Sequence, residues 1–334
     1  MLNVLDGGLQ TTVQDAGRFA WYHIGMPPAG AMDQFSFRVG NILVGNRDDT
    51  AALEITFAGP VMETTEDAVV AVTGADLSVT LNDTPVPQWV AHRVRAGDRI
   101  ACGQAERGVR AYFCISGGIT IPSLLGSRST YLLARFGGVE GRRIQAGDLL
   151  PVGPLRPETD ALIGRTIPSR FLPRLQREIE VRIIMGLCSY RLTDDSVEEF
   201  LRAKWEVSTE ADRVGYRLRG PAFRFKHREA PFGAGSDVSN VVDVGYPVGS
   251  IQVPGGQEAI LLMRDAVTGG GYATIGTAIQ CDLDLLAQAP PGSKVMFRAV
   301  DVDDAMRARR EYRARISRIA GSLSLLDQVG VLGQ

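Results

Sequence analysis

Two polar clusters near the amino terminus carry side chains that could bind an anion or move a proton. The segment TTVQDAGR places Asp15 and Arg18 around a glycine turn. There they could form a salt bridge with each other or hold an anionic substrate. Asp33 ends the segment PAGAMD, directly before a helical pattern. It could be an acid or simply the N-cap of that helix, and the sequence alone favours the N-cap.

A third carboxylate and a cluster of hydroxyls follow. Glu54 lies in ALEITF, where strand alternation places it on the same face as Ala52 and Thr56. A carboxylate that points into a barrel mouth could act as a base, whereas one that points at water would do nothing. The segment LGSRST holds Arg128, Ser129 and Thr130 after a glycine and could cradle a carboxylate or phosphate, or be a plain turn.

The second half of the chain offers a similar set. DRVGYRL supplies Arg217, GSIQVP supplies Gln252, and the glycine run TGGGY could approach a ligand closely. No catalytic serine elbow, Walker-type phosphate loop or local zinc-ligand spacing occurs among these segments. Together they indicate a small anionic ligand bound between β domains, without naming a reaction.

The elements that must position these groups are mostly strands. Many Gly and Pro residues separate short apolar runs, which predicts strands at 69–72, 79–81, 110–115, 181–184 and 260–263. Apolar residues at helical spacing predict helices over 34–44, 196–204, 283–288 and 301 to about 326. The last helix carries six arginines between Arg307 and Arg318. It could be a nucleic-acid arm, but a solvated or subunit-facing helix is favoured.

Composition narrows the class of protein. The 36 basic and 38 acidic residues leave a formal net charge of -2, so nothing at the level of the whole chain points to nucleic acid. The amino terminus lacks a signal-peptide pattern and no apolar run is long enough to cross a bilayer, so no membrane partner is expected. Four scattered cysteines suggest free thiols in a reducing compartment. We therefore expect a soluble cytoplasmic protein.

Three signals recur in the same order in both halves of the chain. LEITFAGP is matched by YRLRGP, RAYFCISGG by AILLMRDAVTGGG, and AGDLLPVG by PGSKVMF. This repeat predicts two similar β domains that arose by duplication. Five prolines between residues 151 and 173 predict a stiff linker between the domains; a long irregular loop inside one large sheet system is the alternative.

The segments taken together resemble a known family. TTVQDAGR, GAMD, LEITFAGP, SGGITIP, LLGSRST, DRVGYRLRGP, GSIQVP and DLDLLAQ, in this order, are similar to the C subunit of 5-oxoprolinase, to KipA and to the related part of urea amidolyase, also described as allophanate hydrolase subunit 2-like. The resemblance implies a mainly β fold with two tandem cyclophilin-like β-barrel domains, a few short helices and a C-terminal helix. The expected boundaries are 1–153 for the first domain, 154–178 for the linker, 179–300 for the second domain and 301–334 for the C-terminal helix and tail.

The resemblance also implies an activity that depends on partners. The chain would work with a KipI-like protein, the B-type partner, and with a LamB/YcsF-like protein, the A-type partner. Together they would open 5-oxo-L-proline to L-glutamate while the complex hydrolyses ATP. One alternative is the carboxyltransferase component of a biotin-dependent urea or amide carboxylase, with biotin on a separate carrier. Another is a KipA-like regulator that binds a KipI-like kinase inhibitor and catalyses nothing. No cofactor or metal is expected to bind this chain alone.

Site residues are carried over from the matching motifs. The resemblance implies proton transfer by Asp33 or Glu54, with Asp15 as a further catalytic candidate. It implies a substrate-binding set of arginines, hydroxyls and amides, in which the arginines and Thr130 would hold the substrate carboxylate or carbonyl. That set is Arg18, Asn41, Arg128, Ser129, Thr130, Arg217 and Gln252.

Overall fold

The computed structural model describes residues 1–155, 159–228, 232–233 and 235–331. The chain forms two compact units. The first unit comprises Met1–Arg18, Ala29–Leu175 and the chain from Arg313 onward; the second comprises Phe19–Pro28 and Gln176–Tyr312. The proline-rich segment up to Leu175 thus clusters with the first unit, and residues 156–158 and 332–334 of the expected linker and tail lie outside the described residues.

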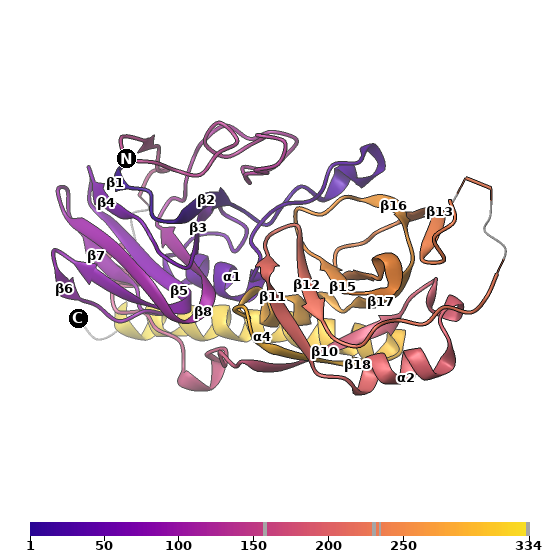
Figure 1. The fold of residues 1–334 in the computed structure, drawn as a ribbon. Coiled ribbons are helices and arrows are strands. Elements are labelled where there is room, and N and C mark those ends of the chain that lie inside the picture. Colours follow the sequence, from indigo (N-terminus) through magenta and orange to yellow (C-terminus); the bar gives the residue numbers. More distant parts are fainter. Residues whose placement is uncertain (156–158, 229–231, 234, 332–334) are drawn as a thin grey trace. The chain divides into compact units, whose positions relative to one another are not determined.

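The first unit is built on one curled, nine-stranded antiparallel sheet (Figure 1). Strand β8 is its centre, because it pairs with β5 along most of its length, with β4 at its start and with β3 at its end. The strands are β1 (Leu2–Asp6), β2 (Gln10–Gln14), β3 (Ala52–Thr56), β4 (Val61–Thr64), β5 (Ala68–Leu81), β6 (Thr84–Pro85), β7 (His92–Val94), β8 (Arg99–Ile115) and β9 (Leu149–Leu150).

Strand β5 differs from its prediction. The sequence predicts two strands, at 69–72 and 79–81, but both runs belong to one strand of 14 residues. Gly74 has φ +98°, and the pairing register with β8 shifts just after it. A bulge at a glycine lets a strand bend and continue, so the turn-like residues in its middle do not end it.

The second unit contains a closed barrel of seven strands, in the order β10-β17-β14-β15-β12-β11-β18. Among these described strands, only the pair β10–β18 is parallel. The barrel strands are β10 (Glu178–Met185), β11 (Trp205–Ala211), β12 (Gly215–Arg219), β14 (Ser250–Gln252), β15 (Ala259–Leu262), β17 (Thr274–Ala278) and β18 (Lys294–Ala299). A separate two-stranded sheet joins β13 (Asn240–Gly245) to β16 (Gly269–Tyr272) (Figure 1).

The α-helices of the described chain form close to the predicted positions: α1 (Gln34–Leu43), α2 (Asp194–Arg202), α3 (Leu283–Ala287) and α4 (Val302–Val331). Helix α1 lies against β5 and β8, and buries Phe35, Phe37 and Val39. Helix α4 starts with Asp303 and Asp304, which suits the positive end of the helix dipole. Short 3₁₀ helices occur at Phe19–Ile24, Thr159–Leu162, Ser169–Phe171, Ser189–Arg191, Pro254–Gly256 and Gln280–Asp282.

The repeat detected in the sequence corresponds to matching strand pairs. LEIT lies in β3 and pairs with the end of β8, with Leu53 opposite Phe113. YRLR lies in β12 and pairs with β15, with Tyr216 opposite Leu261. Both units therefore place the same two signals on neighbouring antiparallel strands. The expected mainly β fold with two tandem β domains, a few short helices and a C-terminal helix is confirmed.

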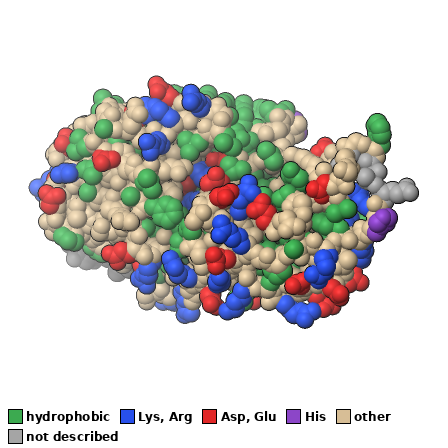
Figure 2. Space-filling model, viewed as in Figure 1, with side chains coloured by type: hydrophobic (Ala, Val, Ile, Leu, Met, Phe, Trp, Pro, Cys, Tyr) green, Lys and Arg blue, Asp and Glu red, His purple; other side chains and the backbone are tan. Residues whose placement is uncertain are grey.

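The surface carries mixed charge. On the face drawn in Figure 2, Lys and Arg side chains are interspersed with Asp and Glu, as the nearly balanced composition predicts. Within the described part of the chain, no helix is both long and apolar enough to cross a membrane.

Candidate active site

Glu54 is a buried carboxylate in the first unit. Its strand β3 places it directly opposite Tyr112 of β8, and only 1% of the residue is exposed. The Tyr112 hydroxyl donates to Glu54 Oε2 at 2.8 Å, and the Met32 amide donates to the same oxygen at 2.7 Å. The Arg110 guanidinium, also buried, approaches Oε1 to 4.0 Å. Glu54 thus faces neither water nor an open barrel mouth.

Tyr112 joins Glu54 to the start of helix α1. Its hydroxyl oxygen accepts a hydrogen bond of 2.8 Å from the Asp33 amide while its proton goes to Glu54. Burial raises the pKa of Tyr112 well above its ordinary value, and the charges of Glu54 and Asp33 raise it further. The phenol therefore stays neutral and remains a hydrogen-bond donor at any working pH.

Asp33 is the N-cap of α1, which is the role that the sequence favours over that of an acid. Its carboxylate accepts from the Ser36 amide at 2.9 Å and from the Ser36 hydroxyl at 2.6 Å. An N-cap of this kind satisfies backbone donors that the first helical turn leaves open. The same residue therefore fixes the helix through its side chain and Tyr112 through its backbone.

The segment from Gly30 to Asp33 holds the cluster together through its backbone. Its four successive amides donate to four different groups of the first unit. The acceptors are Gln14 Oε1, the Asp15 carbonyl, Glu54 Oε2 and Tyr112 Oη. Gly30 has φ +87°, and a Cβ atom there would lie 2.8 Å from the Ala16 carbonyl oxygen. Only glycine fits this approach.

Asp15 fixes the loop that follows in LGSRST. Its Oδ1 accepts from the hydroxyls of Ser127 and Ser129, each at 2.6 Å, and from the Gly17 amide at 2.8 Å. Its Oδ2 accepts from the Arg128 amide at 2.6 Å. A carboxylate that accepts several charge-assisted hydrogen bonds holds structure strongly. The geometry makes Asp15 a positioning group for the loop at 127–130.

The arginines and Thr130 of this cluster are also engaged with backbone. Arg18 is buried, donates from Nη2 to the Ser129 carbonyl and lies 5.1 Å from the centre of the Phe136 ring. Arg128 donates from Nε to the Ile121 carbonyl, and the Thr130 hydroxyl donates to the Val13 carbonyl. The substrate-binding role expected of these residues stays a prediction.

Asn41 lies apart from both groups on helix α1. Its side-chain nitrogen donates to the Thr50 carbonyl at 2.8 Å and its oxygen accepts from Asn46 at 3.0 Å. Asn46 in turn binds the Ile115 carbonyl and the Gly117 amide. The contacts of Asn41 therefore attach the loop after α1 to the end of β8.

The two candidates in the second unit have different surroundings. Arg217 on β12 is partly exposed and pairs with Glu210 and Glu258. Gln252 on β14 is buried and hydrogen-bonds Tyr246, whose pKa is raised mainly by burial. That tyrosine also accounts for one residue of the glycine run, because a Cβ atom on Gly270 would lie 3.0 Å from its ring. The group that approaches Gly270 is thus a protein side chain.

Sequence reasoning missed the residues that connect the site. Tyr112 and Arg110 lie in the apolar run RAYFCI, which reads as plain core, and Ser127 reads as one of several turn hydroxyls. Strand alternation could have flagged Tyr112, since Arg110 and Tyr112 share one face of β8. Within the described residues no cluster of three or more His, Cys, Asp or Glu side chains could hold a metal ion.

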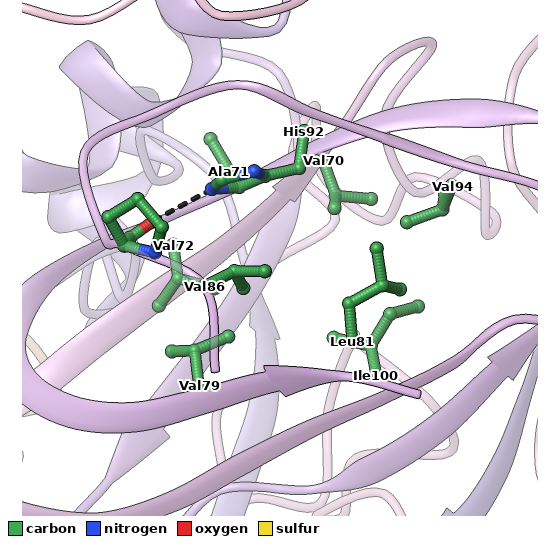
Figure 3. Close-up of a pocket in the computed structure, with 10 residues that line it drawn as sticks. Val70, Ala71, Val72, Val79, Leu81, Val86, His92, Val94 and Ile100 are labelled. Carbon is green, nitrogen blue, oxygen red and sulfur yellow. Dashed lines mark hydrogen bonds between the residues drawn. The ribbon is translucent and has the colours of Figure 1, made fainter. Parts of the chain in front are cut away.

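A small cavity in the first unit carries no chemistry. It measures about 10 Å³ and is lined by aliphatic side chains, such as Val70 and Ile100, together with His92 (Figure 3). The His92 ring binds the Pro87 carbonyl at 2.7 Å. A space of this size holds one water at most, and an apolar lining gives that water no partners.

The sequence matches a family model described as "Carboxyltransferase domain, subdomain A and B", over residues 24–299. Among curated proteins, the C subunit of 5-oxoprolinase from Haemophilus influenzae is 34% identical over 96% of this chain and 97% of its own length. The protein of the same name from Escherichia coli is 32% identical over 97% and 99%. Urea amidolyase of Lachancea kluyveri is 33% identical over 94% of this chain, which spans only 18% of that much longer protein.

Two solved structures are also similar to this chain. The urea carboxylase of Kluyveromyces lactis superposes with a TM-score of 0.88 at 32% identity, covering 95% of this chain and 29% of that one. The protein TTHA0988 superposes with a TM-score of 0.75 at 31% identity, covering 89% and 55%.

Proposed function

Because the chain belongs to the family of carboxyltransferase domains with subdomains A and B, we propose that it is the C-type component of an ATP-dependent 5-oxoprolinase. One observation carries this choice: the two relatives named as the C subunit of 5-oxoprolinase are matched over 97% and 99% of their length. The chain is therefore the size of those relatives. It would act with A- and B-type partners, the latter KipI-like and the former LamB/YcsF-like.

In this reaction the lactam ring of 5-oxo-L-proline is opened by water. The water oxygen bonds to the ring carbonyl carbon, the carbon–nitrogen bond breaks, and the nitrogen gains a proton to become the amino group of L-glutamate. ATP would be hydrolysed by the complex. A general base must take a proton from the water, and a donor must supply one to the nitrogen.

Glu54 is our candidate for the general base. It is a buried carboxyl group, and the Arg110 guanidinium lies 4.0 Å from its Oε1. The neutral phenol of Tyr112 holds Oε2 and connects it to the Asp33 amide. Because Oε2 already accepts from Tyr112 and Met32, Oε1 would take the proton, and the buried carboxylate would have to become accessible to the substrate water in the complex. Asp15 would position the loop at 127–130, from which Arg128 and Thr130 would meet the substrate.

The test is reconstitution with the A- and B-type partners, followed by measurement of L-glutamate formed from 5-oxo-L-proline and of ATP consumed. We expect turnover with the wild-type chain and a loss of at least about a hundredfold with Glu54→Gln. Tyr190→Phe is the matched control, because Tyr190 is 72% exposed. Circular dichroism and thermal unfolding of each variant separate lost catalysis from lost folding. A wild-type complex that forms but makes no glutamate would overturn the proposal.

The second candidate is the carboxyltransferase component of a biotin-dependent urea or amide carboxylase. The superposition on the Kluyveromyces lactis urea carboxylase over 95% of this chain favours it. In that case biotin would arrive on a separate carrier. The carboxyl group would leave the biotin ring nitrogen and bond to the amide nitrogen, Glu54 would accept the proton that the amide nitrogen loses, and the biotin nitrogen would regain a proton. Transfer of labelled carboxyl from carboxybiotin to urea, without glutamate formation from 5-oxo-L-proline, would distinguish this function from the first.

A further inference from the structure

The second unit contains a cavity of about 420 Å³ that none of the candidate site residues lines. Its walls come from the 3₁₀ helix Phe19–Ile24, from the turn after β17 and from the first turns of α4. The volume falls within the range of pockets that bind small organic molecules, roughly 300–1,000 Å³. This cavity is therefore large enough for a ligand, unlike the small one in the first unit.

The charged groups of this cavity have one sign. Arg264 and Arg309 line it, whereas none of the described lining residues is an aspartate or glutamate. Arg264 follows β15 and is only 2% exposed. A guanidinium binds carboxylate or phosphate oxygens through paired hydrogen bonds, and the interaction is stronger where water is excluded. The lining therefore favours an anionic group.

Tyr22 adds a neutral polar group beside Arg264. Burial raises the pKa of Tyr22, while a backbone hydrogen bond with Val248 and the charge of Arg264 act against that rise. The phenol consequently stays protonated. It can hydrogen-bond an anion without adding a negative charge of its own.

Most of the other residues that line the cavity are apolar, apart from Thr277, Gln280 and Cys281, and several of the apolar ones are exposed. Phe19 is 55% exposed, Val302 60% and Met306 43%. When large apolar side chains gather at the mouth of a cavity, it is energetically favourable for a ligand to cover them and remove their surface from water. A ligand that fits both the two arginines and these apolar side chains has an apolar body and one anionic end.

We propose that this cavity binds an amphiphilic organic anion, with its apolar body against Phe19 and Met306 and its anionic oxygens at Arg264 and Arg309. The anion is a carboxylate or a phosphate monoester, since both present oxygens suited to a guanidinium. The proposal goes beyond the reaction of the complex, because the cavity shares no residue with the Glu54 cluster. It gives the second unit a ligand site of its own.

The experiment is calorimetric titration of the purified chain with sodium octanoate, octyl phosphate and 1-octanol. We expect at least one of the two anions to bind, and 1-octanol to bind about tenfold more weakly or not at all. The stronger anion identifies the head group. No binding of either anion at millimolar concentration, or binding of 1-octanol as tight as that of the anions, would overturn the proposal.

Variants on helix α4 locate the binding. Arg309→Ala should weaken binding of the anion about tenfold, and Ala305→Trp should abolish it by filling the cavity. Arg310→Ala is the matched control, since Arg310 is exposed on the same helix and does not line the cavity. Thermal unfolding without ligand shows that each variant is folded. Equal affinities for Arg309→Ala and Arg310→Ala would place the ligand elsewhere.

Discussion

Tyr112 and Glu54 lie opposite each other on neighbouring antiparallel strands and share a hydrogen bond of 2.8 Å. The same phenol oxygen receives the Asp33 amide, so one hydroxyl connects the sheet to the first turn of α1. Both ends of this link are almost fully buried. The link holds in place the carboxylate that we assign to proton transfer.

Replacing Tyr112 by phenylalanine should therefore destabilise the protein. The variant leaves a buried carboxylate and a buried amide each short of one partner, which costs about 1–3 kcal/mol. Urea unfolding followed by circular dichroism measures the difference. Tyr190→Phe, at an exposed position, should change the free energy of unfolding by less than about 0.5 kcal/mol. Equal stability of the two variants would contradict a structural role for the phenol.

Gly30 offers a second test, through its backbone. Gly30→Ala should destabilise the protein by more than about 2 kcal/mol, because the residue has φ +87° and its new Cβ would meet the Ala16 carbonyl. Gly25→Ala is the control, since Gly25 has a similar φ of +81° but nothing within 4 Å of a Cβ atom. It should cost only the left-handed strain, about 1 kcal/mol. Chemical denaturation should rank the two in that order.

Asp15→Asn should release the loop at 127–130. The amide nitrogen cannot accept a hydrogen bond, so either the Arg128 amide loses its acceptor, or the two serine hydroxyls and the Gly17 amide do. We expect a loss of about 3 kcal/mol in the free energy of unfolding. Limited proteolysis should show earlier cleavage near residue 128. Asp49→Asn, which removes only an exposed pair with Arg47, should leave both measurements unchanged.

Asp148 makes stability depend on acid pH. Two hydrogen bonds from Arg142, at 2.7 and 2.8 Å, hold the pKa of the Asp148 carboxyl below its usual range. A lowered pKa in the folded state contributes stability above the unfolded value, about 3.9, and that contribution is lost as pH falls through the folded value. Asp148→Asn should therefore be less stable than wild type above about pH 5, and the difference should shrink toward about pH 2.

The pH series needs a control with a more exposed ion pair. The Asp76 side chain is 36% exposed, against 12% for Asp148, and its partner Arg107 is mostly exposed, so Asp76→Asn should differ little from wild type at any pH. Thermal unfolding measured at intervals between acid and neutral pH gives both comparisons. A constant gap between Asp148→Asn and wild type down to strongly acid pH would contradict the assignment.

The fold was predictable where local signals agree. Asp33 as N-cap and Gly45 after the last turn define α1, and the recurring glycine and proline signals predict paired β domains. The single long strand β5 was not predictable, because Gly74 marks a turn as readily as a bulge. Which of the two forms depends on pairing with β8, and a local pattern holds no information about that pairing.

The sequence predicts which types of residue form the site, but not which residues they contact. The sequence predicts a carboxylate at 15 and hydroxyls near 130, yet their contact spans more than a hundred residues. Tyr112 escaped notice because a strand buried on both faces reads as continuous core. Its importance depends on a register that places it opposite Glu54. Such cross-strand pairings exist only in the folded chain.

Neither of the two units is one continuous stretch of the chain, and this limits where the chain can be cut into fragments that fold. Residues 19–28 interrupt the first unit, and helix α4 begins in the second unit and ends in the first. A cut at residue 175 would leave one fragment without its closing helix turns and the other without the 3₁₀ helix that walls the larger cavity. Each half of the chain thus carries a segment that belongs to the other unit. We expect separately expressed halves to be insoluble, and co-expressed halves to recover a folded, non-covalent complex.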